Sequence, residues 1–195
     1  MKHSIRELIE VARLYFPEGY WPDGYEASVE YQRRAEAHLR ASADYGLWRS
    51  MLRRLRQRFP NVEIRNDSIR FEATAATAAT PLDRCFLATI ELPPRTVHEQ
   101  SHRLGFRVSF VVPYYFIYSA RHVLGTSPLD FPTTFVFTAD EADFVSSIEQ
   151  EIGATFPLHA KMPPDVGMVI VPNVATSLRD LGEATIYDCL FSDYF

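Results

Sequence analysis

A short run near the middle of the chain contains residue types that bind zinc and activate water. His98 and His102 are four positions apart and Glu99 lies between them, so the run has the pattern H-E-x-x-H. On a helix this spacing places two imidazoles one turn apart, where they bind one zinc ion while the glutamate acts as general base. The run is therefore a candidate metal site with His98 and His102 as ligands and Glu99 as base.

Gly105 extends the pattern to H-E-x-x-H-x-x-G, and over these eight residues the chain resembles the metzincin family of zinc endopeptidases. The resemblance implies a zinc-dependent hydrolase of metallopeptidase type, with His98 and His102 as ligands and Glu99 activating water. The chain departs from the family at the third ligand, expected three residues after the glycine. That position holds Val108, which has no metal-binding atom.

The flanking sequence favours strands over the helix that such a site needs. Two prolines stand shortly before His98, and residues 104–110 alternate between apolar and polar types. We therefore expect a polar turn between two strands, with no catalytic residue and no cofactor. A third alternative is a structural or adventitious metal held by His98, His102 and a distant group such as His122.

Other catalytic patterns are missing from the sequence. The two cysteines, Cys85 and Cys189, have neither disulfide-framework nor zinc-ribbon spacing, so we expect reduced, buried thiols. There is no Gly-x-Ser-x-Gly elbow and no glycine-rich phosphate loop. The sequence therefore predicts neither a serine hydrolase nor a nucleotide-binding fold.

Composition predicts a globular chain and limits its partners. The 195 residues are 47% hydrophobic and 23% charged, which excludes a disordered or fibrous chain. The net charge of −5 argues against a dedicated nucleic-acid binder. Residues 1–98 carry a net charge of +2 and residues 99–195 a net charge of −7, so we expect the second half to suit a basic protein partner. With no signal peptide and no membrane-spanning stretch in the sequence, we expect a cytoplasmic protein.

The elements that position these residues fall into two parts. Ser4 and Glu7 form a capping box for a first helix that ends near Tyr15. Two more helices are expected from about 23 to 46 and from about 47 to 59, and a fourth from about 138 to 152. Strands are expected at 62–65, 69–72, 85–92, 104–118, 133–138, 166–171 and 184–190.

This order predicts a single α+β domain over residues 1–195. The helical part covers about 4–59 and the sheet-rich part about 62–195. The N-terminal helices should pack on a largely antiparallel sheet, with one further helix in the C-terminal half.

Two groups of residues are candidates for partner binding. An aromatic loop contributes Tyr20, Trp21, Asp23 and Tyr25, and the acidic start of the fourth helix contributes Asp140, Glu141 and Asp143. Tyrosine and tryptophan dominate protein interfaces, and carboxylates suit a basic partner. This character is similar to that of bacterial immunity proteins. We therefore expect a non-enzymatic immunity or antitoxin protein that neutralises a toxin by direct binding, with the zinc hydrolase as the alternative.

Overall fold

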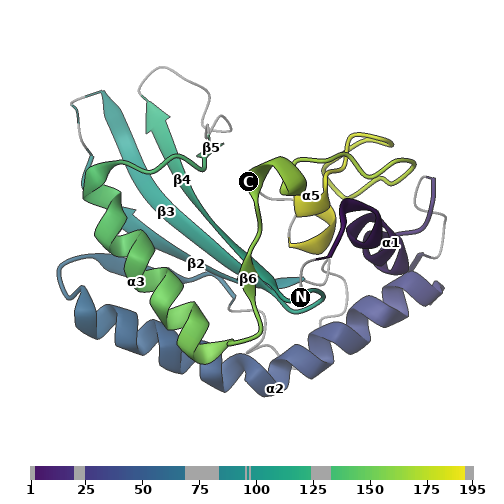
Figure 1. Ribbon diagram of the computed structural model, residues 1–195, viewed down its shortest axis with the longest axis horizontal. Coiled ribbons are helices and arrows are strands. Elements are labelled where there is room, and N and C mark those ends of the chain that lie inside the picture. Colours follow the sequence, from purple (N-terminus) through teal and green to yellow (C-terminus); the bar gives the residue numbers. More distant parts are fainter. Residues whose placement is uncertain are drawn as a thin grey trace.

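The computed structural model describes residues 3–19, 25–68, 84–94, 96, 98–123 and 133–191. As predicted, the fold is α+β, with helices at the N-terminus, a mostly antiparallel sheet and a further helix in the C-terminal half (Figure 1). The helical elements are α1 (Ile5–Tyr15), the 3-10 turn η1 (Tyr25–Ala27), α2 (Val29–Arg58), α3 (Ala139–Thr155), α4 (Pro164–Gly167) and α5 (Ile186–Leu190). The strands are β1 (Glu63–Asn66), β2 (Cys85–Leu92), β3 (Glu99–Ser109), β4 (Tyr114–Val123), β5 (Thr133–Thr134) and β6 (Ala160–Lys161).

Capping fixes where α1 begins, and packing keeps α2 continuous. The predicted capping box of α1 is confirmed, with the Ser4 hydroxyl accepting from the Glu7 amide and the Glu7 carboxylate accepting from the Ser4 amide. The expected break at Gly46 is wrong, because α2 runs unbroken for 30 residues. A glycine inside a helix costs only about 1 kcal/mol, and the burial of Tyr45 and Trp48 on either side of Gly46 outweighs it.

The sheet has the order β1-β2-β3-β4-β5 with antiparallel neighbours, and β6 adds to β4 in parallel. The single strand expected at 104–118 is instead the hairpin of β3 and β4. Ser109 explains the turn, because its hydroxyl accepts from the amides of Val111 and Val112 before Pro113. β1 forms at its expected place but pairs with β2, and residues 69–72 lie outside the described residues.

Three other strand predictions need correction. The strand expected at 133–138 is limited to β5, since Thr138 is already the N-cap of α3. Residues 166–171 contain the end of α4 and one isolated bridge at Ile170. Residues 184–190 contain α5, whose Thr185 and Asp188 form a capping box that commits the segment to a helix.

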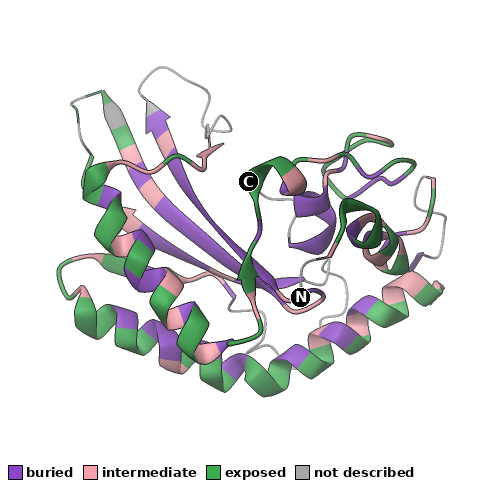
Figure 2. Cartoon of the chain, viewed as in Figure 1, coloured by how far each residue is buried: buried purple, intermediate pink, exposed green. Residues whose placement is uncertain are grey.

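Each face of the sheet is covered by its own hydrophobic core. On one face Trp48, Phe86, Phe106 and Ile148 join a cluster formed by α2 and α3 with the inward side chains of β1 to β4. On the other face α1, α5 and the C-terminal segment pack against alternate residues of β4, including Phe116. Figure 2 shows the resulting pattern, with α2 buried toward the sheet and exposed along its outer side.

Candidate functional site

The segment that resembles a zinc-binding motif lies on a strand. His98 is an exposed turn residue, and β3 begins at Glu99 and continues through His102. The metzincin resemblance depends on a helix that stacks the two histidines one turn apart. That helix is not formed here, because the β-type alternation after Pro94 continues the segment into a sheet between β2 and β4.

His102 is instead part of a buried polar network that joins the sheet to α3. Its Nε2 donates to Glu141 Oε1 at 2.7 Å, and the Ser119 hydroxyl donates to the same oxygen at 2.5 Å. The other carboxylate oxygen accepts from the amide and the hydroxyl of Thr138, at 2.6 and 2.8 Å. Arg121 Nη2 lies 3.6 Å from Oε1. Glu141 therefore caps its own helix and anchors it to β3 and β4 at the same time.

These contacts hold Glu141 in its ionised form. Burial by itself raises the pKa of this carboxyl, but the hydrogen bonds from Ser119, Thr138 and His102 outweigh burial and lower the pKa to about 2. A serine, a histidine and a carboxylate are all present, yet the carboxylate lies between the other two. A nucleophile needs the histidine in that central place. The network is built for structure and not for activating the Ser119 hydroxyl.

The remaining histidine of the metal alternative lies on the other side of the sheet. His122 pairs in register with Ser101, whereas His102 pairs with Arg121. Successive residues of a strand point to opposite faces, so His102 and His122 do not converge. Among the described residues, no group of three or more His, Cys, Asp or Glu side chains is arranged to hold a metal ion.

Of the aromatic-loop residues predicted to bind a partner, Tyr25 is the one that the structure describes. Residues 20–24, which include Tyr20, Trp21 and Asp23, lie outside the described residues. Tyr25 is buried, donating to the Tyr15 carbonyl at 3.2 Å and accepting from Arg34 at 2.9 Å. Burial raises the pKa of its phenol. The side chain is thus part of the packing between η1, α1 and α2.

The acidic start of α3 divides into inward and outward residues. Glu141 is fully buried in the network above, while Asp140 and Asp143 are exposed. Figure 1 shows the start of α3 at one end of the molecule and α1 with the start of α2 at the other. Tyr25 and the acidic start of α3 therefore lie far apart.

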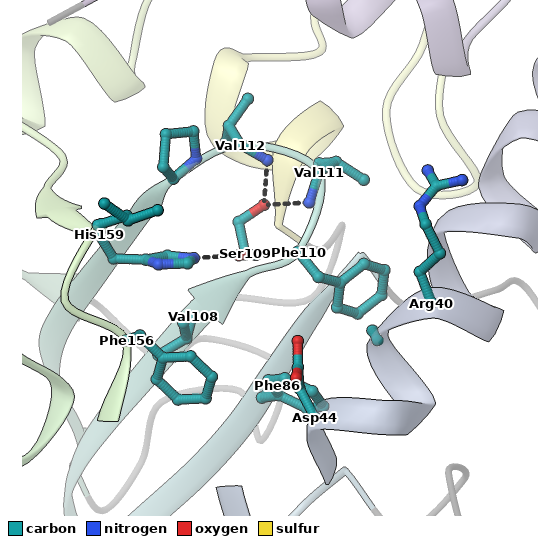
Figure 3. Close-up of a pocket in the computed structure, with 13 residues that line it drawn as sticks. Arg40, Asp44, Phe86, Val108, Ser109, Phe110, Val111, Val112, Phe156 and His159 are labelled. Carbon is teal, nitrogen blue, oxygen red and sulfur yellow. Dashed lines mark hydrogen bonds between the residues drawn. The ribbon is translucent and has the colours of Figure 1, made fainter. Parts of the chain in front are cut away.

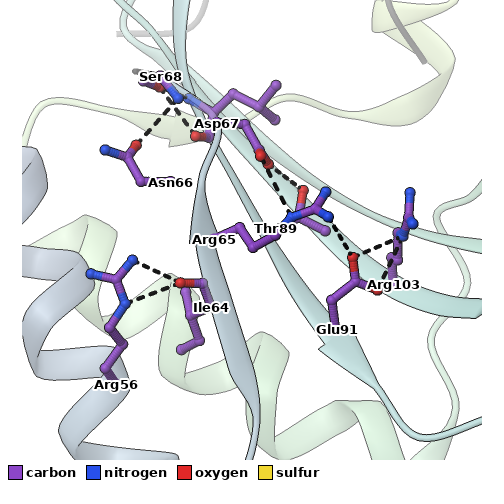
Figure 4. A network of polar contacts seen from close by, with 10 residues as sticks. Arg56, Ile64, Arg65, Asn66, Asp67, Ser68, Thr89, Glu91 and Arg103 are labelled. Carbon is purple, nitrogen blue, oxygen red and sulfur yellow. Dashed lines mark hydrogen bonds and ion pairs between the residues drawn. The ribbon is translucent and has the colours of Figure 1, made fainter. Parts of the chain in front are cut away.

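A row of charged side chains also runs across the sheet face opposite α2, at the β1 edge (Figure 4). Glu91 pairs with Arg65 at 3.3 Å and with Arg103 at 3.0 Å, and Thr89 donates to Asp67 at 2.6 Å. These groups satisfy one another across β1, β2 and β3. The row serves to hold the edge strand in register.

The sequence reasoning missed one exposed surface, the segment from 164 to 183, which begins with α4. Met168, Ile170 and Leu178 are each more than half exposed there, and Asp165, Asp180 and Glu183 are exposed beside them. The signal is present as apolar residues between carboxylates, but the same pattern predicts a strand at 166–171.

Comparison with protein families, with curated proteins and with solved structures gives no match. No helix in the described ranges combines the length and apolar character that crossing a bilayer requires.

Proposed function

We propose that this chain is a non-enzymatic protein of the immunity or antitoxin type, which neutralises a bacterial toxin in the cytoplasm by covering a basic surface on it. The proposal depends on one observation: in the segment 164–183, exposed apolar side chains lie next to exposed carboxylates. Interfaces of this kind combine an apolar centre with a charged rim.

The charge of the C-terminal part supports a basic partner. Residues 133–191 contain nine carboxylate side chains and two cationic ones. Both cations are already engaged, Lys161 with Glu149 at 2.9 Å and Arg179 with the buried Asp188 at 3.4 Å. Within the described ranges, the exposed carboxylates of the segment form no ion pair; these are Asp165, Asp180 and Glu183. Their field favours and accelerates association with a positively charged surface.

Hydrogen bonds order the backbone that carries the apolar side chains of the segment. Ile170 bridges Thr185, and the Val171 amide donates to the Ala184 carbonyl at 2.8 Å. The turn that presents Leu178 is closed by a hydrogen bond from the Thr176 amide to the Arg179 carbonyl. A surface that is ordered before binding loses less entropy when the complex forms.

The residue that precedes the aromatic loop in the chain contacts this segment. Gly19, the last described residue before Tyr20, donates its amide to the Asn173 carbonyl at 2.7 Å and bridges Val174. Its φ of +92° favours glycine. We therefore assign Tyr20, Trp21 and Asp23 to the same contact surface as the segment 164–183. The distant Asp140 and Asp143 would act through long-range attraction.

The test is rescue from toxicity. A basic protein that co-purifies with the tagged chain from its own host is expressed alone and then together with the chain. The proposal expects growth arrest in the first case and growth in the second. A double variant, Leu178→Arg with Asp180→Lys, should abolish both co-purification and rescue.

The control variant carries the same kind of changes on an exposed part of α2, Leu39→Arg with Glu36→Lys, and should rescue like the unaltered chain. A partner that is not toxic, or rescue that survives the changes at Leu178 and Asp180, would overturn the proposal.

A further inference from the structure

An open pocket lies where the middle of α2 faces the β3–β4 turn and the end of α3. Its volume is about 310 Å³, at the small end of the range of about 300–1,000 Å³ in which small-molecule sites fall. Figure 3 shows side chains from all three elements converging on it. It lies apart from the segment 164–183 and is independent of the function proposed above.

The inner wall of the pocket is aromatic. Phe86 lies at the centre, with its ring centroid 5.8 Å from Phe110 and 6.0 Å from Phe156, and Val108 completes the wall. Ala41 faces these rings from α2, and its small side chain leaves the space open. Such a wall takes up an aromatic ring or a branched apolar chain and offers ring edges and faces for contact.

The mouth of the pocket carries one charge of each sign. Arg40 and Asp44 are one turn apart on α2, and both are exposed. Arg40 has a loose contact of 3.8 Å with Glu36. Side chains four apart on a helix lie about 5–6 Å from each other at Cβ. The mouth therefore carries a cation and an anion one helical turn apart (Figure 3).

His159 forms the third polar group at the mouth and is held rigidly. Its Nε2 must donate to the Ser109 carbonyl, 2.8 Å away, because a carbonyl only accepts. Burial lowers the pKa of the imidazole, against opposing effects of the Ser109 carbonyl and Asp44. In its neutral form the ring keeps Nδ1 as a hydrogen-bond acceptor.

We propose that this pocket binds a free α-amino acid with an aromatic or branched apolar side chain. The side chain packs on the three phenylalanines, the carboxylate pairs with Arg40, and the ammonium pairs with Asp44. A plain carboxylic acid would bring its charge close to Asp44, and a plain amine would bring its charge close to Arg40. A zwitterion carries both charges on neighbouring atoms and matches the mouth without an unpaired group.

The experiment is isothermal titration calorimetry of the full chain with three probes that share one ring. These are L-phenylalanine, 3-phenylpropanoate, which lacks the ammonium, and 2-phenylethylamine, which lacks the carboxylate. L-phenylalanine should bind at one site, and each of the other probes about tenfold more weakly, because each loses one charge-assisted contact. L-alanine, which cannot fill the aromatic wall, should bind more weakly still.

Two variants separate the contributions of the two charges. Asp44→Asn should reduce the affinity for L-phenylalanine about tenfold and should strengthen 3-phenylpropanoate, because it removes the like charge beside that carboxylate. Arg40→Gln should also reduce the affinity for L-phenylalanine about tenfold and should strengthen 2-phenylethylamine, because it removes the like charge beside that ammonium. Arg53→Gln, an exposed arginine elsewhere on α2, is the control and should change nothing. The proposal is overturned if L-phenylalanine gives no saturable heat, if all three probes bind equally, or if both pocket variants bind L-phenylalanine like the unaltered chain.

Discussion

Nε2 of His102 lies 2.7 Å from Oε1 of Glu141, although the two residues are 39 positions apart in the chain. One side chain comes from β3 and the other from the first turn of α3. The Ser119 hydroxyl of β4 reaches the same carboxylate oxygen. A single buried carboxylate thus fixes the start of a helix over two strands, and several predictions about stability depend on it.

Removing this charge should cost far more than removing an exposed one on the same helix. Glu141→Gln leaves buried donors facing an amide, so we expect the free energy of unfolding to fall by about 3 kcal/mol. Glu149→Gln, which breaks a half-exposed pair with Lys161, should change it by less than about 1 kcal/mol. Urea denaturation of both variants checks this. Equal effects would show that the Glu141 network does not hold α3.

The same carboxylate predicts acid sensitivity. In the folded chain the pKa of Glu141 is about 2, and in the unfolded chain it has its ordinary value of 4.5. The stabilisation is therefore complete above pH 4.5 and is lost as the pH falls through this window toward 2, by about 3 kcal/mol in total. Denaturation curves between pH 6 and pH 2.5 should show this loss in the unaltered chain and much less of it in Glu141→Gln. Parallel curves for the two proteins would contradict the assignment.

The two histidines of the H-E-x-x-H run should behave differently. His102→Ala removes a buried donor to Glu141 and should lower the unfolding free energy by about 2 kcal/mol. His98→Ala alters an exposed turn residue and should change it by less than about 0.5 kcal/mol. The measurement is repeated with added zinc and with a chelator. A zinc-dependent loss of equal size in both variants would restore the metal-site interpretation.

Two glycines provide a matched test of packing. A Cβ at Gly105 would lie 2.1 Å from Cζ of Tyr118, whose ring covers β3 at that point, so Gly105→Ala should destabilise the chain by about 2 kcal/mol or more. A Cβ at Gly153, on the exposed side of α3, meets nothing within 4 Å. Gly153→Ala should therefore stabilise the chain by about 0.5–1 kcal/mol. Thermal unfolding distinguishes these opposite signs, and a neutral Gly105→Ala would mean that Tyr118 does not rest on β3.

The aromatic loop gives a prediction about binding and not about stability. Trp21→Ala should weaken association with the basic partner at least tenfold, as is typical of a tryptophan at the centre of an interface, while the melting temperature stays unchanged. Leu39→Ala, an exposed apolar residue of α2, is the control and should bind normally. Unchanged affinity of the Trp21 variant, measured by surface plasmon resonance, would remove the loop from the proposed interface.

Local signals in the sequence predicted local structure well. Ser4 and Glu7 marked the start of α1, and the acidic run after Thr138 marked the start of α3. The errors came where one signal competed with another. Thr185 and Asp188 form a capping box, but they lie in an apolar run whose pattern predicts a strand. Gly46 predicts a helix break, but the packing of its neighbours keeps α2 continuous.

Sites assembled from distant parts of the chain were beyond the reach of such signals. Nothing near His102 in the sequence indicates that its partner is Glu141, because only the pairing of β3 with β4 and the docking of α3 bring them together. In the same way, Arg40, Asp44 and His159 meet at one pocket only because α2 crosses below the β3–β4 turn. Side chains with no distinctive spacing acquire a shared role from tertiary packing.

The unbroken course of α2 has a mechanical consequence. Thirty residues at about 1.5 Å each make a rod of about 45 Å, and this rod contacts α1 near its start and α3 with β1 near its end. Its second half belongs to the core on one face of the sheet, and its first half contacts α1, which belongs to the core on the other face. Arg40 and Asp44 lie close to its midpoint. A rod that is clamped at both ends cannot fray from either, so its central amides should exchange with deuterium only when the whole fold opens.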